Sequence, residues 1–112
     1  MTNISKYDVV VMRFPFASSL KYKARPAVVV SSDIYNLNSR DTLLISAISS
    51  QVSTKLVFEK EIVEWEEAGL LKPSIFKASV ATIEREYIIT KLGTLSASDA
   101  RNLDAFLKEI CK

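Results

Sequence analysis

Hydrophobic residues along this chain are grouped in short runs separated by polar or proline-containing segments. Several runs are rich in β-branched and aromatic residues, which favour strands, and each has the length of a strand. The pattern predicts strands over residues 8–14, 26–31, 42–48, 55–59, 74–83 and 87–92.

The end of the chain has a different period, which is typical of a helix. Apolar residues at i, i+3, i+4 and i+7 form one helical face made of Leu103, Phe106, Leu107 and Ile110. Ser96 and Asp99 resemble a capping box, so the helix should begin there. A short helix over 62–68 with Gly69 as its C-cap, and a helical turn through Tyr35 capped by Ser32, are also expected.

Six short strands without regularly alternating helices indicate a mainly β fold, either a small, strongly bent antiparallel sheet or a barrel. A length of 112 residues predicts one domain over 1–112. No run approaches the roughly 20 apolar residues of a membrane span. The only cysteine is Cys111, which excludes an intrachain disulfide, so a reducing cytoplasmic location is expected.

The chain has no histidine, and this limits the chemistry that it can perform. Ser-His-Asp, Cys-His and two-histidine ribonuclease arrangements are excluded. A zinc site is nearly excluded, and no acidic residues show a recognisable ligand spacing. No cofactor is therefore expected, and catalysis would use Arg, Lys, Asp/Glu, Tyr or Ser/Thr side chains.

Cations are concentrated before the second predicted strand. Proline cannot donate a hydrogen bond within a sheet, so Pro26 is expected to open this strand and to leave Arg25 at a loop-to-strand junction. Lys21 and Lys23 lie just before it, and this region would attract phosphates. Residues 56–70 instead contain five glutamates and would repel them. Two ordinary solvated faces explain these charges equally well.

Four segments of the chain together resemble the MazF/PemK family of toxins from type II toxin–antitoxin systems. They are FPFASSLKYKARPAVVVSSDIYN, LLISAISSQ, VEWEEAGLLKPSIFKASVATIE and IITKLGTLSASD. The resemblance implies an SH3-like barrel with a C-terminal helix, usually as a homodimer. It also implies sequence-selective, metal-independent cleavage of single-stranded RNA and inhibition by a cognate antitoxin peptide.

The resemblance assigns roles to individual residues. Arg25 falls on the catalytic arginine and Ser49 on the hydroxyl position that accompanies it. RNA contacts are assigned to Ser19, Lys21, Lys23, Gln51 and Lys77. The chain departs from the family in two places, since Tyr7 replaces a glycine and Ala78 and Ala81 leave the later segment without the aspartate of some members.

The chemistry implied is attack of a ribose 2′-hydroxyl on the phosphate, which leaves a 2′,3′-cyclic phosphate. A guanidinium suits the stabilisation of the dianionic phosphorane because it offers planar, bidentate donors. Alternatives remain at the level of the residues. Arg25 is open to interpretation as a surface arginine in an ion pair, and Ser49 as a turn residue. The whole chain is also compatible with a non-catalytic module, either a gyrase-poisoning toxin or a degenerate toxin that only binds antitoxin.

Overall fold

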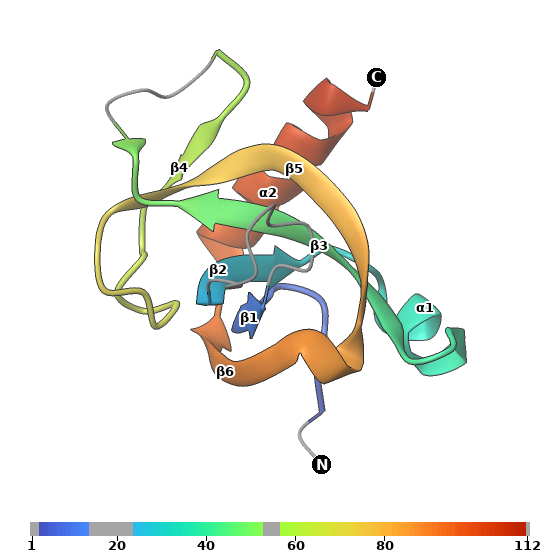
Figure 1. Cartoon of the computed structure of the whole chain (residues 1–112). Coiled ribbons are helices and arrows are strands. Elements are labelled where there is room, and N and C mark those ends of the chain that lie inside the picture. The colour runs from blue at the N-terminus through green and yellow to red at the C-terminus, as the bar shows by residue number, and fades with distance from the viewer. Residues whose placement is uncertain (1–2, 14–23, 53–56, 112) are drawn as a thin grey trace.

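The computed structural model describes residues 3–13, 24–52 and 57–111, and its centre is one antiparallel sheet of six strands (Figure 1). The strand order across the sheet is β4-β5-β3-β2-β1-β6. The strands are β1 (Asp8–Arg13), β2 (Ala24–Val29), β3 (Thr42–Ser49), β4 (Lys60–Ile62), β5 (Ser74–Glu84) and β6 (Ile88–Thr94). The predicted mainly β class is therefore confirmed, as a strongly curled half-barrel.

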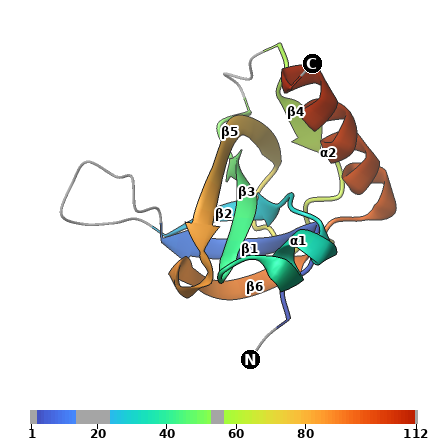
Figure 2. The same cartoon turned by 90° about the vertical axis from the view of Figure 1, so that its right-hand side faces the viewer.

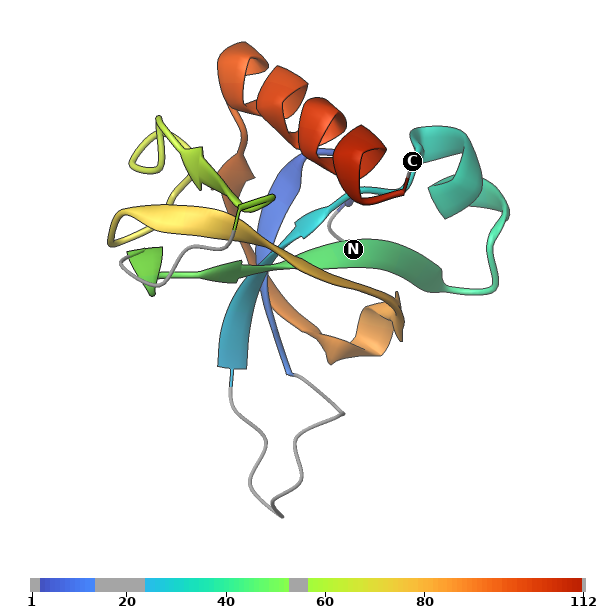
Figure 3. The same cartoon turned by 90° about the horizontal axis from the view of Figure 1, so that it is seen from above.

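Two helices complete the fold. The short helix α1 (Asp33–Asn38) connects β2 to β3, and α2 (Ala97–Ile110) follows β6. Figure 2 shows α2 packed along one side of the curled sheet, with α1 next to the start of β3. Seen from above, α2 lies along one side of the strands (Figure 3). No helix in the described part of the chain is both long and apolar enough to cross a membrane.

The core consists of two apolar clusters, one on each face of the sheet. The first lies between the sheet and α2, where the rings of Phe76 and Phe106 stack with their centroids 6.1 Å apart. The second lies on the opposite face and includes Met12, Leu43 and Ile45, all fully buried. Side chains alternate between faces along a strand, so burial on both faces explains the nearly continuous apolar runs in the sequence.

The ends of α2 and α1 confirm the predicted capping. The Ser96 hydroxyl accepts the N–H of Asp99, and the Ser32 hydroxyl accepts the N–H of Tyr35. Helix α1 continues to Asn38, further than the single turn expected. The Asp99 carboxylate is completely buried and accepts the N–H groups of Val63 and Glu64 at 2.9 and 2.8 Å, which joins α2 to the segment after β4.

Two predicted elements are wrong. Ile62 is the last residue of β4, and residues 63–68 form consecutive turns and not a helix. The strand expected over 55–59 lies later, at Lys60–Ile62. Residues 55–56 are outside the described residues, while Val57 and Phe58 form an exposed turn. Three residues, Lys60–Ile62, have partners on β5, and this pairing decides the position of the strand.

The chain's two glycines lie where two backbone segments meet. Gly69 has a φ of +88°, which is favourable only for glycine, as expected for a cap position. A Cβ on Gly69 would lie 2.4 Å from the carbonyl oxygen of Leu92, and one on Gly93 would lie 2.7 Å from that of Ala68. This close approach holds the turns after β4 against the edge strand β6.

A bulge bends β5 over the sheet. Ser46 pairs with Val80, whereas Ile48 pairs with Phe76, so three residues of β5, 77–79, lie opposite the single residue Ala47. The Ser46 hydroxyl donates a hydrogen bond to the carbonyl oxygen of Lys77 at 2.7 Å and holds the bulge. Bulges bend the strand that carries the extra residues, and β5 is visibly curved in Figure 1.

Candidate functional site

Arg25 is the second residue of β2 and is paired with Met12 of β1. The expectation that Pro26 opens the strand is wrong, since β2 begins at Ala24 and Pro26 pairs with Val11. The pairing with β3 begins only at Ala27, so Pro26 lies where β2 is paired on one side. A proline is tolerated there, as on an edge strand, because it has no N–H group to donate to a second neighbouring strand.

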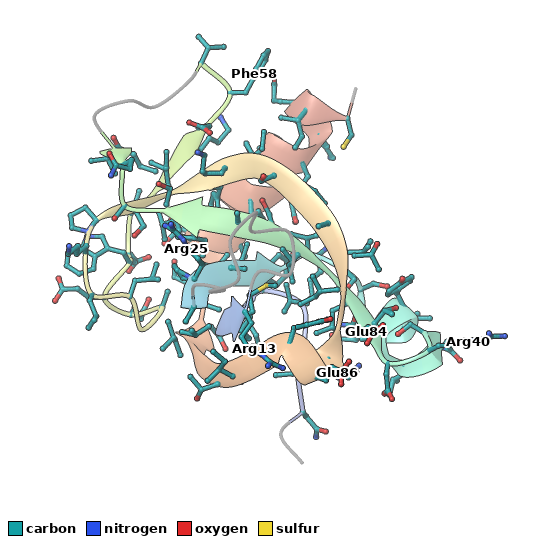
Figure 4. The ribbon with its side chains drawn as sticks, viewed as in Figure 1. Arg13, Arg25, Arg40, Phe58, Glu84 and Glu86 are labelled. Atoms are coloured by element: carbon teal, nitrogen blue, oxygen red, sulfur yellow. The ribbon has the colours of Figure 1, made fainter. Side chains whose placement is uncertain are left out.

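The side chain of Arg25 is exposed. Within the described residues, ion pairs join Lys6 to Asp104 at 3.8 Å and Lys91 to Asp8 at 3.4 Å, and neither involves Arg25. Figure 4 shows Arg25 at the side of the molecule opposite Arg40, which extends away from α1 and β3 into solvent. The interpretation of Arg25 as a paired surface arginine therefore finds no partner in the described part of the chain.

Ser49 is the last residue of β3 and is half-buried. The pairing of β2 with β3 runs from Val29–Ile45 to Ala27–Ala47. Side chains alternate along each strand, so Arg25 and Ser49, each two residues from this last pair, lie on the same face of the sheet as Ala27 and Ala47. The Ser49 hydroxyl also accepts the N–H of Gln51 at 3.1 Å, which orients the end of the strand.

Lys77 lies at the start of the bulge in β5, and its side chain is exposed. Its neighbour Phe76 points into the cluster beneath α2. Alternation along the strand therefore directs Lys77 to the opposite face, which is the face of Arg25 and Ser49. Three of the sequence-predicted residues thus share one face, on three adjacent strands in the order β2, β3 and β5.

The other predicted contacts are less well defined by the structure. Gln51 is exposed directly after β3. Ser19, Lys21 and Lys23 lie outside the described residues. Ala78 and Ala81 place no carboxylate on β5 next to Lys77, as the sequence indicated.

The sheet register adds a residue that no motif in the sequence pointed out. Glu61 of β4 pairs with Ile75 of β5, and Ile75 pairs in turn with Ser49. Glu61 is exposed and therefore lies on the same face as Ser49, two strands away. Its neighbour Ile62 is buried beneath α2. In the sequence, an exposed Glu61 next to a buried Ile62 indicates only a strand with two different faces. The strand order is needed to relate Glu61 to Ser49.

Two hollows of the described surface lie elsewhere. One, of about 770 Å³, is lined by the turn from β5 to β6, with Arg40, Glu84 and Glu86 among its residues. A hydrogen bond and like-charge repulsion from Glu86 raise the pKa of Glu84 there. A second, of about 820 Å³, lies beside the end of α2 and includes Leu107. Neither hollow is lined by Arg25, which is exposed near the start of β2, or by Ser49, which is half-buried at the end of β3.

No group of three or more acidic or cysteine side chains within the described ranges is arranged to hold a metal ion. The candidate site consists instead of a guanidinium, a hydroxyl and an ammonium group. This set can bind a phosphodiester through charge-assisted hydrogen bonds.

Comparison with known proteins gives one family and a consistent set of solved structures. Residues 5–111 match the family described as PemK-like, MazF-like toxin of type II toxin-antitoxin system. No curated protein matches the chain.

The solved structures are distant in sequence but close in fold. MazF from Deinococcus radiodurans has a TM-score of 0.74 at 15% identity, and the match covers 96% of this chain and 94% of that one. The Mycobacterium tuberculosis toxin MazF-mt6 gives 0.71 at 19% identity, with 91% and 93% covered. A mycobacterial endoribonuclease in complex with its cognate antitoxin gives 0.72 at 13% identity, with 97% and 93% covered. Such low identities support the fold and no more.

Proposed function

Because the chain belongs to the PemK-like, MazF-like toxins of type II toxin–antitoxin systems, we propose that it is the toxin of such a pair. In this proposal it is an endoribonuclease that cuts single-stranded RNA at selected sequences without a metal ion. The observation that carries the proposal is the exposed guanidinium of Arg25 on the same face of the sheet as the hydroxyl of Ser49, as alternation along β2 and β3 places them.

The reaction is an internal transesterification of the RNA backbone. The ribose 2′-oxygen attacks phosphorus, the bond from phosphorus to the 5′-oxygen breaks, and the products are a 2′,3′-cyclic phosphate and a 5′-hydroxyl end. The guanidinium of Arg25 holds two phosphate oxygens and stabilises the charge that develops on them. Ser49 donates a further hydrogen bond to the same phosphate.

RNA binding uses the open face around these two residues. Lys77 contacts a neighbouring phosphate, and such contacts position the RNA without reading its sequence. Gln51, Ser19, Lys21 and Lys23 complete the proposed contact set. An exposed face suits a polymer, which must lie across the protein and continue on both sides.

The proposed partners follow from the family. A toxin of this kind acts on RNA in the cytoplasm, forms a homodimer and is inhibited by a cognate antitoxin peptide. One mycobacterial relative in fold has been solved with its cognate antitoxin.

The test is cleavage of a mixed pool of single-stranded RNA by the purified protein in EDTA, followed by mapping of the ends. Wild type should leave 2′,3′-cyclic phosphates at a recurring short sequence. Arg25→Ala should reduce the rate by about 10²–10³-fold, the usual effect of removing one positioned donor. Arg40→Ala is the matched control, because Arg40 is an exposed arginine on the other side of the molecule (Figure 4). A wild type that leaves all RNAs intact contradicts the proposal.

A second candidate, a toxin that binds a protein target without cutting RNA, is favoured by one observation. Ala78 and Ala81 remove from β5 the carboxylate that some family members carry. Under this candidate, wild type would slow growth or capture gyrase or antitoxin while leaving RNA intact. The same RNA assay therefore separates the two candidates.

A further inference from the structure

The proposed cleavage needs a group that accepts the 2′-hydroxyl proton, and none of Arg25, Ser49 and Lys77 is suited to this. A guanidinium stays protonated in proteins, and a serine hydroxyl needs a base of its own. The chain has no histidine, and Ala78 and Ala81 leave the nearest part of β5 without a carboxylate. The base must come from another strand.

The sheet register places one carboxylate in the same row as the site. Glu61 of β4 is paired with Ile75 of β5, and Ile75 is paired with Ser49 of β3. Directly paired residues point to the same face, so Ser49 and Glu61 share one face of the curled sheet. Alternation along β2 and β3 from their last pair, Ala27 and Ala47, adds Arg25 to this face.

The distances in this row suit one reacting nucleotide. Adjacent strands lie about 4.8 Å apart, which separates Ser49 from Glu61 by about 10 Å and Arg25 from Glu61 by about 14 Å along the sheet. A phosphate held by Arg25 and Ser49 would then carry its ribose toward Glu61.

The residue between Ser49 and Glu61 in this row carries no charge. Ile75 is apolar and 1% exposed, so its neighbours cover it and a bound nucleotide would rest on those neighbours and not on Ile75 itself. Lys77 lies two residues from Ile75 on the same strand and face, so the carboxylate has cations on the side where the phosphate would bind. Glu61 itself is exposed and forms no ion pair with any described residue.

We propose that Glu61 is the general base of the reaction. Its carboxylate accepts the 2′-hydroxyl proton while the 2′-oxygen bonds to phosphorus and the bond to the 5′-oxygen breaks. The leaving 5′-oxygen takes a proton from the Lys77 ammonium or from water. This inference rests on the proposed RNA cleavage and identifies the group that the family comparison left open.

The experiment compares Glu61→Gln with Glu67→Gln, which removes a carboxylate from the exposed turn after β4. Single-turnover cleavage is measured at saturating RNA across pH 3.5–8, a range that includes the ordinary pKa of a glutamate side chain, about 4.3. Glu61→Gln should lower the rate by about 10²–10⁴-fold, the usual contribution of a general base. It should also remove the acidic limb of the pH–rate profile and leave the affinity for a 2′-deoxy RNA analogue unchanged or higher. Glu67→Gln should keep both the rate and the limb.

Two outcomes overturn the inference, and they are distinguishable. If wild type cleaves RNA and Glu61→Gln keeps its rate and its acidic limb, Glu61 is not the base although the proposed function stands. If wild type cleaves nothing, both fail together. Because Glu61 is exposed, equal melting temperatures for the two glutamine variants are expected, and they separate a lost base from a lost fold.

Discussion

At the residue scale, Tyr7 has a backbone conformation that normally favours glycine. Its φ is +76°, in the left-handed region, and the family pattern that the sequence resembles has a glycine at this position. The N–H of Tyr7 donates to the carbonyl of Val29 at 2.8 Å, and its own carbonyl accepts the N–H of Leu95 at 3.0 Å. These bonds hold the strained residue between β2 and the start of α2.

The roles of Arg25 and Ser49 can be separated by removing the hydroxyl alone. Ser49→Ala removes one neutral donor to the phosphate and leaves the guanidinium in place. The rate of RNA cleavage should fall about 5-fold, less than for Arg25→Ala, since a bond from a neutral donor contributes about 1 kcal/mol. Single-turnover kinetics measures this effect.

The control for Ser49→Ala is Ser98→Ala, which removes an exposed hydroxyl from the first turn of α2. It should cleave at the wild-type rate. A Ser49→Ala protein as fast as wild type would show that the hydroxyl has no part in the reaction.

At the scale of elements, Tyr7 also joins β1 to α2. Its hydroxyl donates to the two Asp104 carboxylate oxygens at 3.0 and 2.8 Å. Burial, together with the hydrogen bond to Asp104, raises the pKa of Tyr7. The protonated phenol therefore contributes stability that is complete below its ordinary pKa of about 10 and is lost as pH rises through the raised value in the folded protein.

Tyr7→Phe tests this link between β1 and α2. At pH 7 the free energy of unfolding should fall by about 1–2 kcal/mol, the range for a hydrogen bond to a charged group that is partly buried. Between pH 9.5 and 11 the stability of wild type should decline more steeply than that of Tyr7→Phe. Urea unfolding at a series of pH values measures both effects.

Tyr35→Phe is the matched control, because the Tyr35 hydroxyl lies 3.2 Å from the Thr42 hydroxyl at an exposed position. Its stability should stay close to that of wild type at pH 7. Equal stabilities of Tyr7→Phe and Tyr35→Phe would contradict a stabilising contact between Tyr7 and Asp104.

At the scale of the whole molecule, one sheet is shared by two cores. Val28 and Val29 are neighbours on β2, yet Val28 belongs to the cluster beneath α2 and Val29 to the cluster on the opposite face. Each cluster therefore includes side chains of β2, and unfolding of this strand would disrupt both clusters. The two cores should therefore unfold together.

Truncation of one buried residue in each core tests this cooperativity. Phe106→Ala should lower the free energy of unfolding by about 3–5 kcal/mol and Leu43→Ala by about 2–5 kcal/mol. Fluorescence of Trp65, the chain's only tryptophan, reports the cluster beneath α2, and far-UV circular dichroism reports the sheet. The two urea curves of each variant should coincide, and separate transitions in Leu43→Ala would contradict a shared core.

The sequence was a good guide wherever structure depends on near neighbours. Ser96 and the spacing of Leu103, Phe106 and Leu107 indicated α2, and Ser32 indicated α1. It was a poor guide in the segment from 55 to 68. There a short strand is selected by its pairing with β5, and the turns that follow it are bound to the distant carboxylate of Asp99.

The candidate site was predictable only in part. Arg25 and Ser49 were singled out by their place in a family pattern, and both are on one face by the register. Glu61 was not singled out, because nothing in the sequence distinguishes it from the other four glutamates of the same short segment. Its relation to Ser49 exists only through Ile75, on a strand that follows β4 in the chain and separates it from β3 in the sheet.

By itself the sequence determined the type of most elements and the exclusion of histidine chemistry, which depend on composition and on contacts between residues a few positions apart. The family followed from the resemblance of four segments to a known pattern. Only the tertiary structure decided which residues of β3, β5 and β4 are paired across the sheet and which backbone must accept a positive φ. Strand register results from the packing of both sheet faces at once, and no local segment of the chain contains that information.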